Sequence, residues 1–178
     1  MKFIFLLALL PTLTQAAEDC SAAAPTALLD KAFYPKHEFH QKKGNTADEA
    51  ATLPKGNKLR IDFSGCEDSV NQTFFLTYAK EKNSAADLVF WAGRAADEIS
   101  ALHLNDREDI KNQLVKFLRS VKNLKATAGK DGSSVSICMD DSKPTTDGCS
   151  FEHLGLLSLA VSNKGPNVSL VIERSNNL

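Results

Sequence analysis

The sequence lacks the short motifs that mark several common enzyme classes. It has no G-x-S-x-G, the turn that presents the serine of an α/β hydrolase, and no G-x-G-x-x-G of a dinucleotide-binding turn. The Gly-Lys pair in "AGKDGSS" (128–134) follows a predicted helix and lacks the earlier glycine of a phosphate-binding loop. A C-x-x-C motif is also absent, so a thioredoxin-like redox role has no support. We therefore assign no catalytic residue and expect no cofactor, and the prediction leans away from an enzyme.

An excess of charge of either sign is absent too. The chain has 21 basic and 22 acidic side chains in 178 residues. A general nucleic-acid binder needs an excess of Lys and Arg to neutralise phosphates, so we expect no nucleic-acid partner.

A second long apolar run is missing. The first follows Lys2 as "FIFLLALLPTL", which is shorter than the roughly 20 residues that span a bilayer, and the small residues of "TQA" come next. We expect residues 1–16 to be a signal peptide cleaved after Ala16, and residues 17–178 to form a single domain. The mature chain is then periplasmic or secreted, with no stable membrane insertion after cleavage.

Four cysteines are present: Cys20, Cys66, Cys138 and Cys149. An even number in an exported chain predicts two disulfides, and four cysteines allow three pairings. We favour Cys138 with Cys149 and Cys20 with Cys66. Because Val135, Ile137 and Met139 are expected to face the core, Cys138 should point to the other face of its strand.

The pattern of apolar residues predicts an α+β fold. Alternation at Leu59, Ile61 and Phe63 indicates a half-buried strand, and "NQTFFLTYAK" (71–80) indicates a second one. Further strands are expected at 134–140, 153–162 and 167–173, and hairpins dominate the order of elements. We therefore expect a largely antiparallel sheet of about five strands with two longer helices on one face, disulfide-stapled.

The two longer helices show apolar stripes at helical spacing. The first is expected from a cap at Ser84 to about Leu102, and the second begins with a capping-box pattern at Asn105 and Glu108. The first stripe consists of Leu88, Ala92, Ala95, Ile99 and Leu102, and the second of Ile110, Leu114, Phe117, Leu118, Val121 and Leu124. A short helix is expected over 25–33, and the polar segment 35–58 is expected to be a long connection.

"YPKHEFHQKK" (34–43) comes closest to a metal site. His37 and His40 are three residues apart, whereas the metalloprotease helix needs H-E-x-x-H. A third ligand would have to come from His103, His153 or a distant carboxylate. A solvated histidine pair in a polar loop is the simpler interpretation, so these two are weak metal candidates.

Three surfaces are candidates for a partner. One is the loop that Cys138 and Cys149 would close, which includes Ser142, Lys143, Pro144, Thr145, Thr146 and Asp147. Another is a basic stripe on the second long helix, which includes Lys122 and Lys125. The third is the sheet face without helices, expected to be lined by Arg60, Asp62, Ser64, Thr73, Phe75, Thr77, Ser134, Ser136, Ser169 and Val171.

These observations favour an exported, non-enzymatic binding protein that engages a protein partner in the cell envelope. An inhibitor or immunity-type protein against an envelope-degrading enzyme is the sharpest form of that hypothesis. One alternative is a metal-binding protein or metal-dependent enzyme that uses His37 and His40. Another is a structural accessory of an envelope complex.

Overall fold

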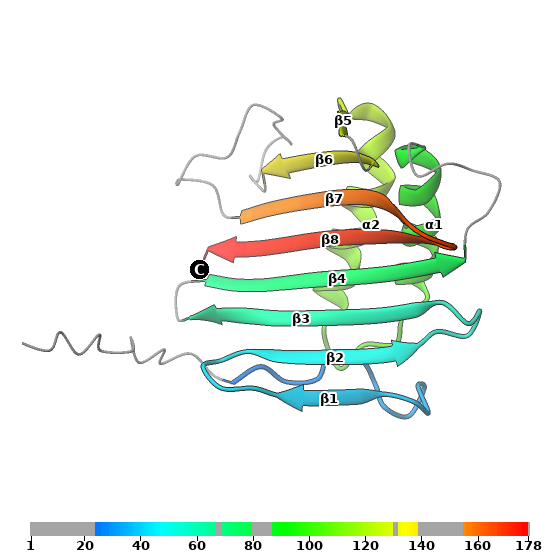
Figure 1. The fold of residues 1–178 in the computed structure, drawn as a ribbon. Helices are drawn as coiled ribbons and strands as arrows, with labels where there is room; N and C mark the ends of the chain where they lie inside the picture. Colours follow the sequence, from blue (N-terminus) through cyan, green and yellow to red (C-terminus); the bar gives the residue numbers. More distant parts are fainter. Residues whose placement is uncertain (1–23, 67–68, 80–86, 130–131, 139–154, 178) are drawn as a thin grey trace, which may run out of the picture.

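A computed structural model describes residues 24–66, 69–79, 87–129, 132–138 and 155–177, with the backbone alone at 66, 69, 128, 129 and 177. Within these ranges the chain forms one eight-stranded sheet with two α-helices against it (Figure 1). The strands are β1 (Glu38–Gln41), β2 (Ala47–Thr52), β3 (Lys58–Cys66), β4 (Ser69–Ala79), β5 (Thr127–Gly129), β6 (Gly132–Cys138), β7 (Gly155–Lys164) and β8 (Asn167–Asn177). The helices are α1 (Leu88–Ser100), α2 (Glu108–Ser120) and the 3-10 turn η1 (Val121–Asn123).

The sheet is built from two meanders, β1 to β4 and β5 to β8, and the two long helices lie between them in sequence. Its order is β1-β2-β3-β4-β8-β7-β6-β5, and every neighbouring pair is antiparallel. The last strands of the two meanders, β4 and β8, pair over eleven positions at the centre. The expected antiparallel α+β fold is therefore confirmed, but the sheet has eight strands rather than about five.

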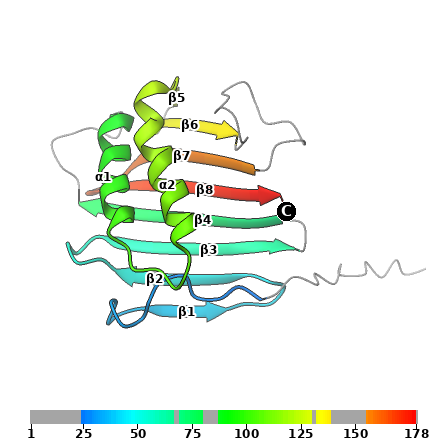
Figure 2. The same cartoon turned by 180° about the vertical axis from the view of Figure 1, so that it is seen from behind.

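Both helices cover the same face of the sheet, as Figure 2 shows from behind. Along β3, β4 and β8 every second side chain points to this face, since neighbouring residues of a strand alternate in direction. Their buried apolar residues are Leu59, Ile61, Phe63, Phe74, Leu76, Tyr78, Val168, Leu170 and Ile172. The side chain of Trp91 from α1 completes this core, with its ring centroid 5.4 Å from that of Tyr78.

The apolar stripes of both helices are confirmed. Every predicted member is buried except Leu124, which is partly buried against the core. The predicted caps differ. The N-cap of α1 is Asp87, whose carboxylate accepts a hydrogen bond from the Phe90 amide, and Ser84 lies outside the described residues. The N-cap of α2 is Arg107, without a side-chain cap, because the Asn105 side chain binds the N-terminal segment instead.

Two predictions for the N-terminal part are wrong. No helix forms over the described residues of 25–33, where the chain is mostly extended and Leu29 forms an isolated bridge with Leu104. The polar segment 35–58 is not a long connection either, since it contains β1, β2 and the start of β3. Its apolar signal is weak because β2 buries two alanines and a glutamate, Ala47, Ala51 and Glu49.

The segment "AGKDGSS", which follows the second predicted helix, also contributes to the sheet. Its two described ends belong to the antiparallel pair β5 and β6. Gly132 begins β6 with a φ of +150°, and a Cβ there would overlap the carbonyl oxygen of Val161 on β7. A glycine is required where two strands approach so closely, so this residue marks a strand start as well as a turn.

The predicted disulfides stay predictions. Cys138 is buried and is not a free thiol, but Cys20 and Cys149 lie outside the described residues and the side chain of Cys66 is not described. No cysteine pair therefore has both side chains in the described part. The expected direction of the Cys138 side chain, away from the face of Val135 and Ile137, agrees with its position in β6. Val135 and Ile137 are buried in the core, and Cys138 follows Ile137 directly on the strand.

Candidate functional site

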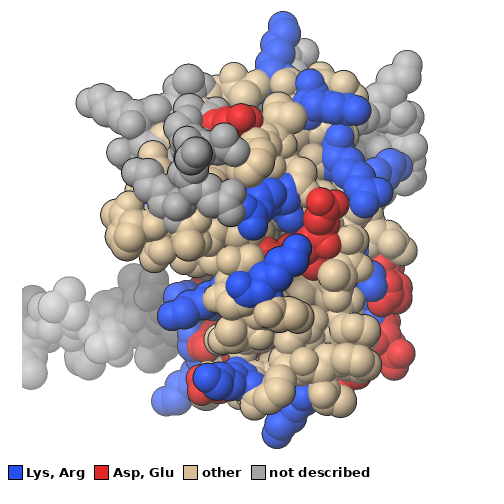
Figure 3. All heavy atoms as spheres, turned by 90° about the vertical axis from the view of Figure 1, so that its right-hand side faces the viewer, with Lys and Arg blue, Asp and Glu red and all other residues tan. Residues whose placement is uncertain are grey.

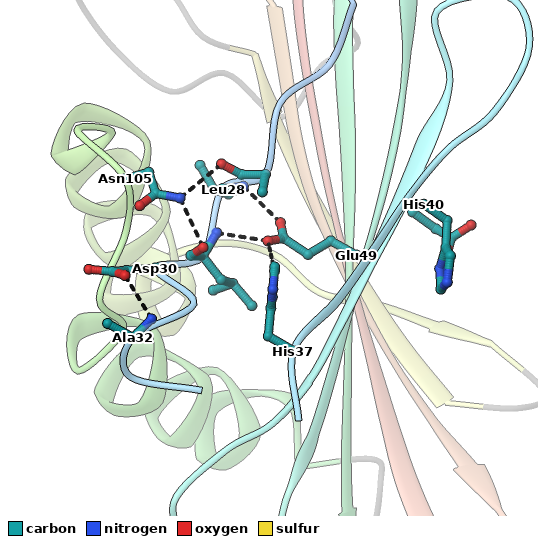
Figure 4. A network of polar contacts seen from close by, with 10 residues as sticks. Leu28, Asp30, Ala32, His37, His40, Glu49 and Asn105 are labelled. Atoms are coloured by element: carbon teal, nitrogen blue, oxygen red, sulfur yellow. Dashed lines mark hydrogen bonds and ion pairs between the residues drawn. The ribbon is translucent and has the colours of Figure 1, made fainter. Parts of the chain in front are cut away.

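His37 lies just before β1 and points at Glu49, which β2 supplies (Figure 4). The Nε2 atom of His37 is 2.5 Å from Oε1 of Glu49, and the side chains are 6% and 0% exposed. The Glu49 carboxylate also accepts hydrogen bonds from the backbone amides of Leu28 and Leu29, each at 2.9 Å.

The Glu49 network is closed on all sides by protein groups. Each carboxylate oxygen accepts from a peptide N–H, and one also contacts the imidazole. A buried carboxylate is tolerated when such donors replace its water. The arrangement holds the N-terminal segment on the sheet, and a fully buried carboxylate offers no access to a substrate. We therefore assign Glu49 and His37 a structural role.

His40 lies on the other side of the sheet from His37. Its Nδ1 atom is 3.3 Å from Asp48, the residue before Glu49 on β2, and consecutive residues of a strand point to opposite faces (Figure 4). The two histidines thus do not converge on one ion. Among the described residues, no group of three or more His, Cys, Asp or Glu side chains could hold a metal ion.

The predicted open face of the sheet is the face that no described helix covers (Figures 1 and 2). Its predicted members lie at positions that alternate with the buried core residues, although Ser169 is itself buried, with 4% exposed. Arg60 donates from Nε to Asp62 at 2.8 Å and makes a second contact with the same carboxylate. The carbon of its guanidinium lies 5.0 Å from the ring centroid of Phe75.

This pairing fixes Arg60 on the surface. Its bidentate bond to Asp62 raises the pKa of the guanidinium above its ordinary value. The cation lies over a half-buried aromatic ring, which adds an attraction of about 0.5 to 1 kcal/mol at an exposed site. An ordered Arg on an aromatic platform is a common feature of protein interfaces.

A concavity of about 510 Å³ lies beside Arg60, where the open face meets the ends of the strands. Its described lining includes four basic side chains, Lys36, Lys58, Arg60 and Lys164, and one acidic side chain, Glu38. Figure 3 views the strand-end side, where Lys and Arg extend along the full height with Asp and Glu beside several of them. We call this hollow the basic concavity, and it is complementary to an acidic surface.

The partner-binding residues predicted from the sequence are only partly described. Lys122 in η1 and Lys125 after it are both exposed. Ser142, Lys143, Pro144, Thr145, Thr146 and Asp147 lie outside the described residues, between β6 and β7 in the sequence. The sequence analysis missed the basic concavity, because its lysines come from three separate parts of the chain and converge only in the folded sheet.

No helix in the described part of the chain is long and apolar enough to cross a membrane. Comparison with protein-family models, with curated proteins and with solved structures finds no match to this chain.

Proposed function

We propose that the chain is an exported, non-enzymatic binding protein that engages a protein partner in the cell envelope through the open face of its sheet. The observation that carries the proposal is the one-sided sheet: described helices cover one face, and the other presents an ordered Arg60–Phe75 pair beside the basic concavity. Exposed polar faces are common, but a hollow with four basic and one acidic side chains favours one class of contact, an acidic protein surface.

The sharpest form of this proposal is an inhibitor or immunity-type protein against an envelope-degrading enzyme. In that form, the loop 142–147 and the lysines at 122 and 125 add contacts, and disulfides at Cys138 with Cys149 and Cys20 with Cys66 make the fold resistant to proteases. The alternative is a structural accessory of an envelope complex, which uses the same face without blocking an activity.

Site-specific photo-crosslinking in the native cell tests the contact. A photoreactive amino acid is placed at Thr73 or Ala160 on the open face, and at Lys116 on the exposed side of α2 as the control. The open-face sites should give one adduct with the same partner, and Lys116 should not. The proposal fails if Lys116 yields that adduct equally well or if neither open-face site yields an adduct.

Charge reversal then identifies the part of the face that matters. Lys58→Glu with Lys164→Glu should reduce the adduct and weaken binding to the purified partner by about tenfold, since charge pairs at an interface act together. Lys122→Glu with Lys125→Glu tests the helix stripe, and deletion of 142–147 tests the loop. Addition of the chain to the purified partner separates an inhibitor, which lowers its activity, from an accessory, which leaves it unchanged.

A further inference from the structure

Arg174 near the end of β8 is a buried cation on the helix side of the sheet. The residue is 5% exposed, and the partners of its guanidinium among the described residues are side-chain amides. Nε donates to Oε1 of Gln113 on α2 at 2.6 Å, and Nη1 donates to Oε1 of Gln72 on β4 at 3.2 Å. Nη2 has no acceptor among the described residues, although a guanidinium carries five N–H donors.

No carboxylate in the described part of the chain contacts this guanidinium directly. Burial lowers the pKa of Arg174, while Asp109 opposes that change and Arg107 reinforces it. Asp109 is exposed and forms its own ion pair with Arg107 at 3.7 Å. Glu173, the preceding residue, lies on the other face and accepts from the Ser158 hydroxyl. An arginine does not lose its proton in a protein, so a positive charge is held in the interior without a paired anion from the described residues.

A pocket of about 320 Å³ opens beside this guanidinium. It lies where β3 and β8 end and β4 begins, at the left of Figure 1, away from the basic concavity. Its described lining has two cations, Arg107 and Arg174, and no acidic residue. The remaining described lining residues are Ala24, Pro25, Thr26, Ala27, Leu28, Asn45, Phe63, Ser64, Gly65, Val70, Gln72 and Asn176.

We propose that this hollow, the Arg174 pocket, binds a small organic carboxylate whose oxygens pair with the Arg174 guanidinium and whose hydrocarbon part packs against Phe63, Val70 and Leu28. A planar carboxylate matches the donor geometry of a guanidinium and supplies a negative charge, which the described lining lacks. Pockets of this size with mostly apolar walls and a few convergent polar groups are typical small-molecule sites.

The chemistry of the lining favours a carboxylate over a phosphate. A phosphate dianion needs several donors and a second strong cation, whereas Arg107 is already paired with Asp109. Phosphate also gains nothing from the apolar walls beside Arg174. This site is independent of the proposed partner contact, so either proposal can fail alone.

The test is titration of the purified chain with hexanoate, followed by NMR of the arginine Nε–H and glutamine side-chain amide signals. Hexanamide, which has the same shape without the charge, and inorganic phosphate are the matched ligands. Hexanoate should bind saturably with a Kd in the millimolar range or below and shift the signals of Arg174, Gln72 and Gln113. Hexanamide and phosphate should bind at least tenfold more weakly.

Three variants make the assignment specific. Arg174→Gln should weaken hexanoate binding at least tenfold, and Thr26→Trp, which fills the exposed side of the pocket without changing Arg174, should do the same in a chain that folds normally. Arg119→Gln on the exposed side of α2 should bind like the unchanged protein. The proposal is overturned if hexanoate does not saturate, if phosphate binds as tightly as hexanoate, or if folded Thr26→Trp retains full affinity.

Discussion

His37 and Glu49 lie twelve residues apart and meet with 2.5 Å between Nε2 and Oε1, under a segment that the same carboxylate holds by two backbone amides. Glu49→Ala removes the acceptor of all three groups, and each buried donor left without a partner costs about 1 to 3 kcal/mol. We expect the free energy of unfolding to fall by at least about 3 kcal/mol. Urea unfolding followed by fluorescence of Trp91, the single tryptophan, measures it.

The neighbouring residue Asp48 provides the control for Glu49. Its carboxylate lies on the opposite face of β2, where it contacts Lys42 and His40, which are both more than half exposed. Asp48→Ala should therefore cost much less than Glu49→Ala. Equal losses would mean that the Glu49 network contributes no more than a surface ion pair.

Tyr78 makes the stability of the fold sensitive to alkaline pH. Burial, with the nearby Glu98 carboxylate, raises the pKa of the Tyr78 phenol far above its ordinary value, and the hydroxyl has no hydrogen-bond partner at bonding geometry among the described residues. Above about pH 10 the unfolded chain releases this proton while the folded chain keeps it. The free energy of unfolding should then fall by up to about 1.4 kcal/mol per pH unit from this residue alone, with no such loss below pH 10.

Tyr78→Phe isolates that contribution. At neutral pH we expect a change within about 1 kcal/mol, because the described residues give the lost hydroxyl no hydrogen-bond partner. By about pH 11, the variant should have gained about 1.4 kcal/mol relative to the unchanged chain, compared with their difference at neutral pH. Parallel curves of stability against pH for the two chains would show that the folded protein lets Tyr78 ionise normally.

Gly132 and Gly93 should respond in opposite ways to alanine. A Cβ at Gly132 would overlap the Val161 carbonyl oxygen, and its φ of +150° disfavours other residues, so Gly132→Ala should lower the free energy of unfolding by more than about 2 kcal/mol. Gly93 on the exposed side of α1 has no atom within 4 Å of an added Cβ, so Gly93→Ala should raise it by about 0.5 to 1 kcal/mol. Thermal unfolding of both variants decides this, and a stabilised Gly132→Ala would contradict the close strand approach.

The sequence predicts those elements whose burial follows the residue type. Leu59, Ile61 and Phe63 alternate as a strand and are buried, and the stripes of both helices meet the sheet as expected. In β2 the same alternation is present, but its buried positions are Ala47, Glu49 and Ala51. A sequence pattern predicts that a glutamate is exposed, because it does not show which groups could hydrogen-bond a buried carboxylate. For Glu49 those groups are at Leu28, Leu29 and His37.

Arg174 is a second charged residue whose burial the sequence analysis did not predict. We expected the last strand to end at Glu173, whereas β8 continues to Asn177. The available signal was the register of Val168, Leu170 and Ile172, which places position 174 on the same buried face. What no local pattern provides is the pocket around it, since Gln72 comes from β4, and Gln113 and Arg107 come from α2 and its N-cap.

Asn105 and Glu49 hold the same stretch of chain from two sides, so their contributions should not add. Nδ2 of Asn105 donates to the carbonyl oxygens of Ala27 and Leu29, while Glu49 accepts from the amides of Leu28 and Leu29. Asn105→Ala alone should cost about 1 to 2 kcal/mol, because it leaves these carbonyl groups without their donor. In a chain that already carries Glu49→Ala, the segment has lost its attachment to β2, and the same change should cost about 1 kcal/mol less. A double-mutant cycle by urea unfolding measures this coupling, and strict additivity would show that the two side chains stabilise separate units.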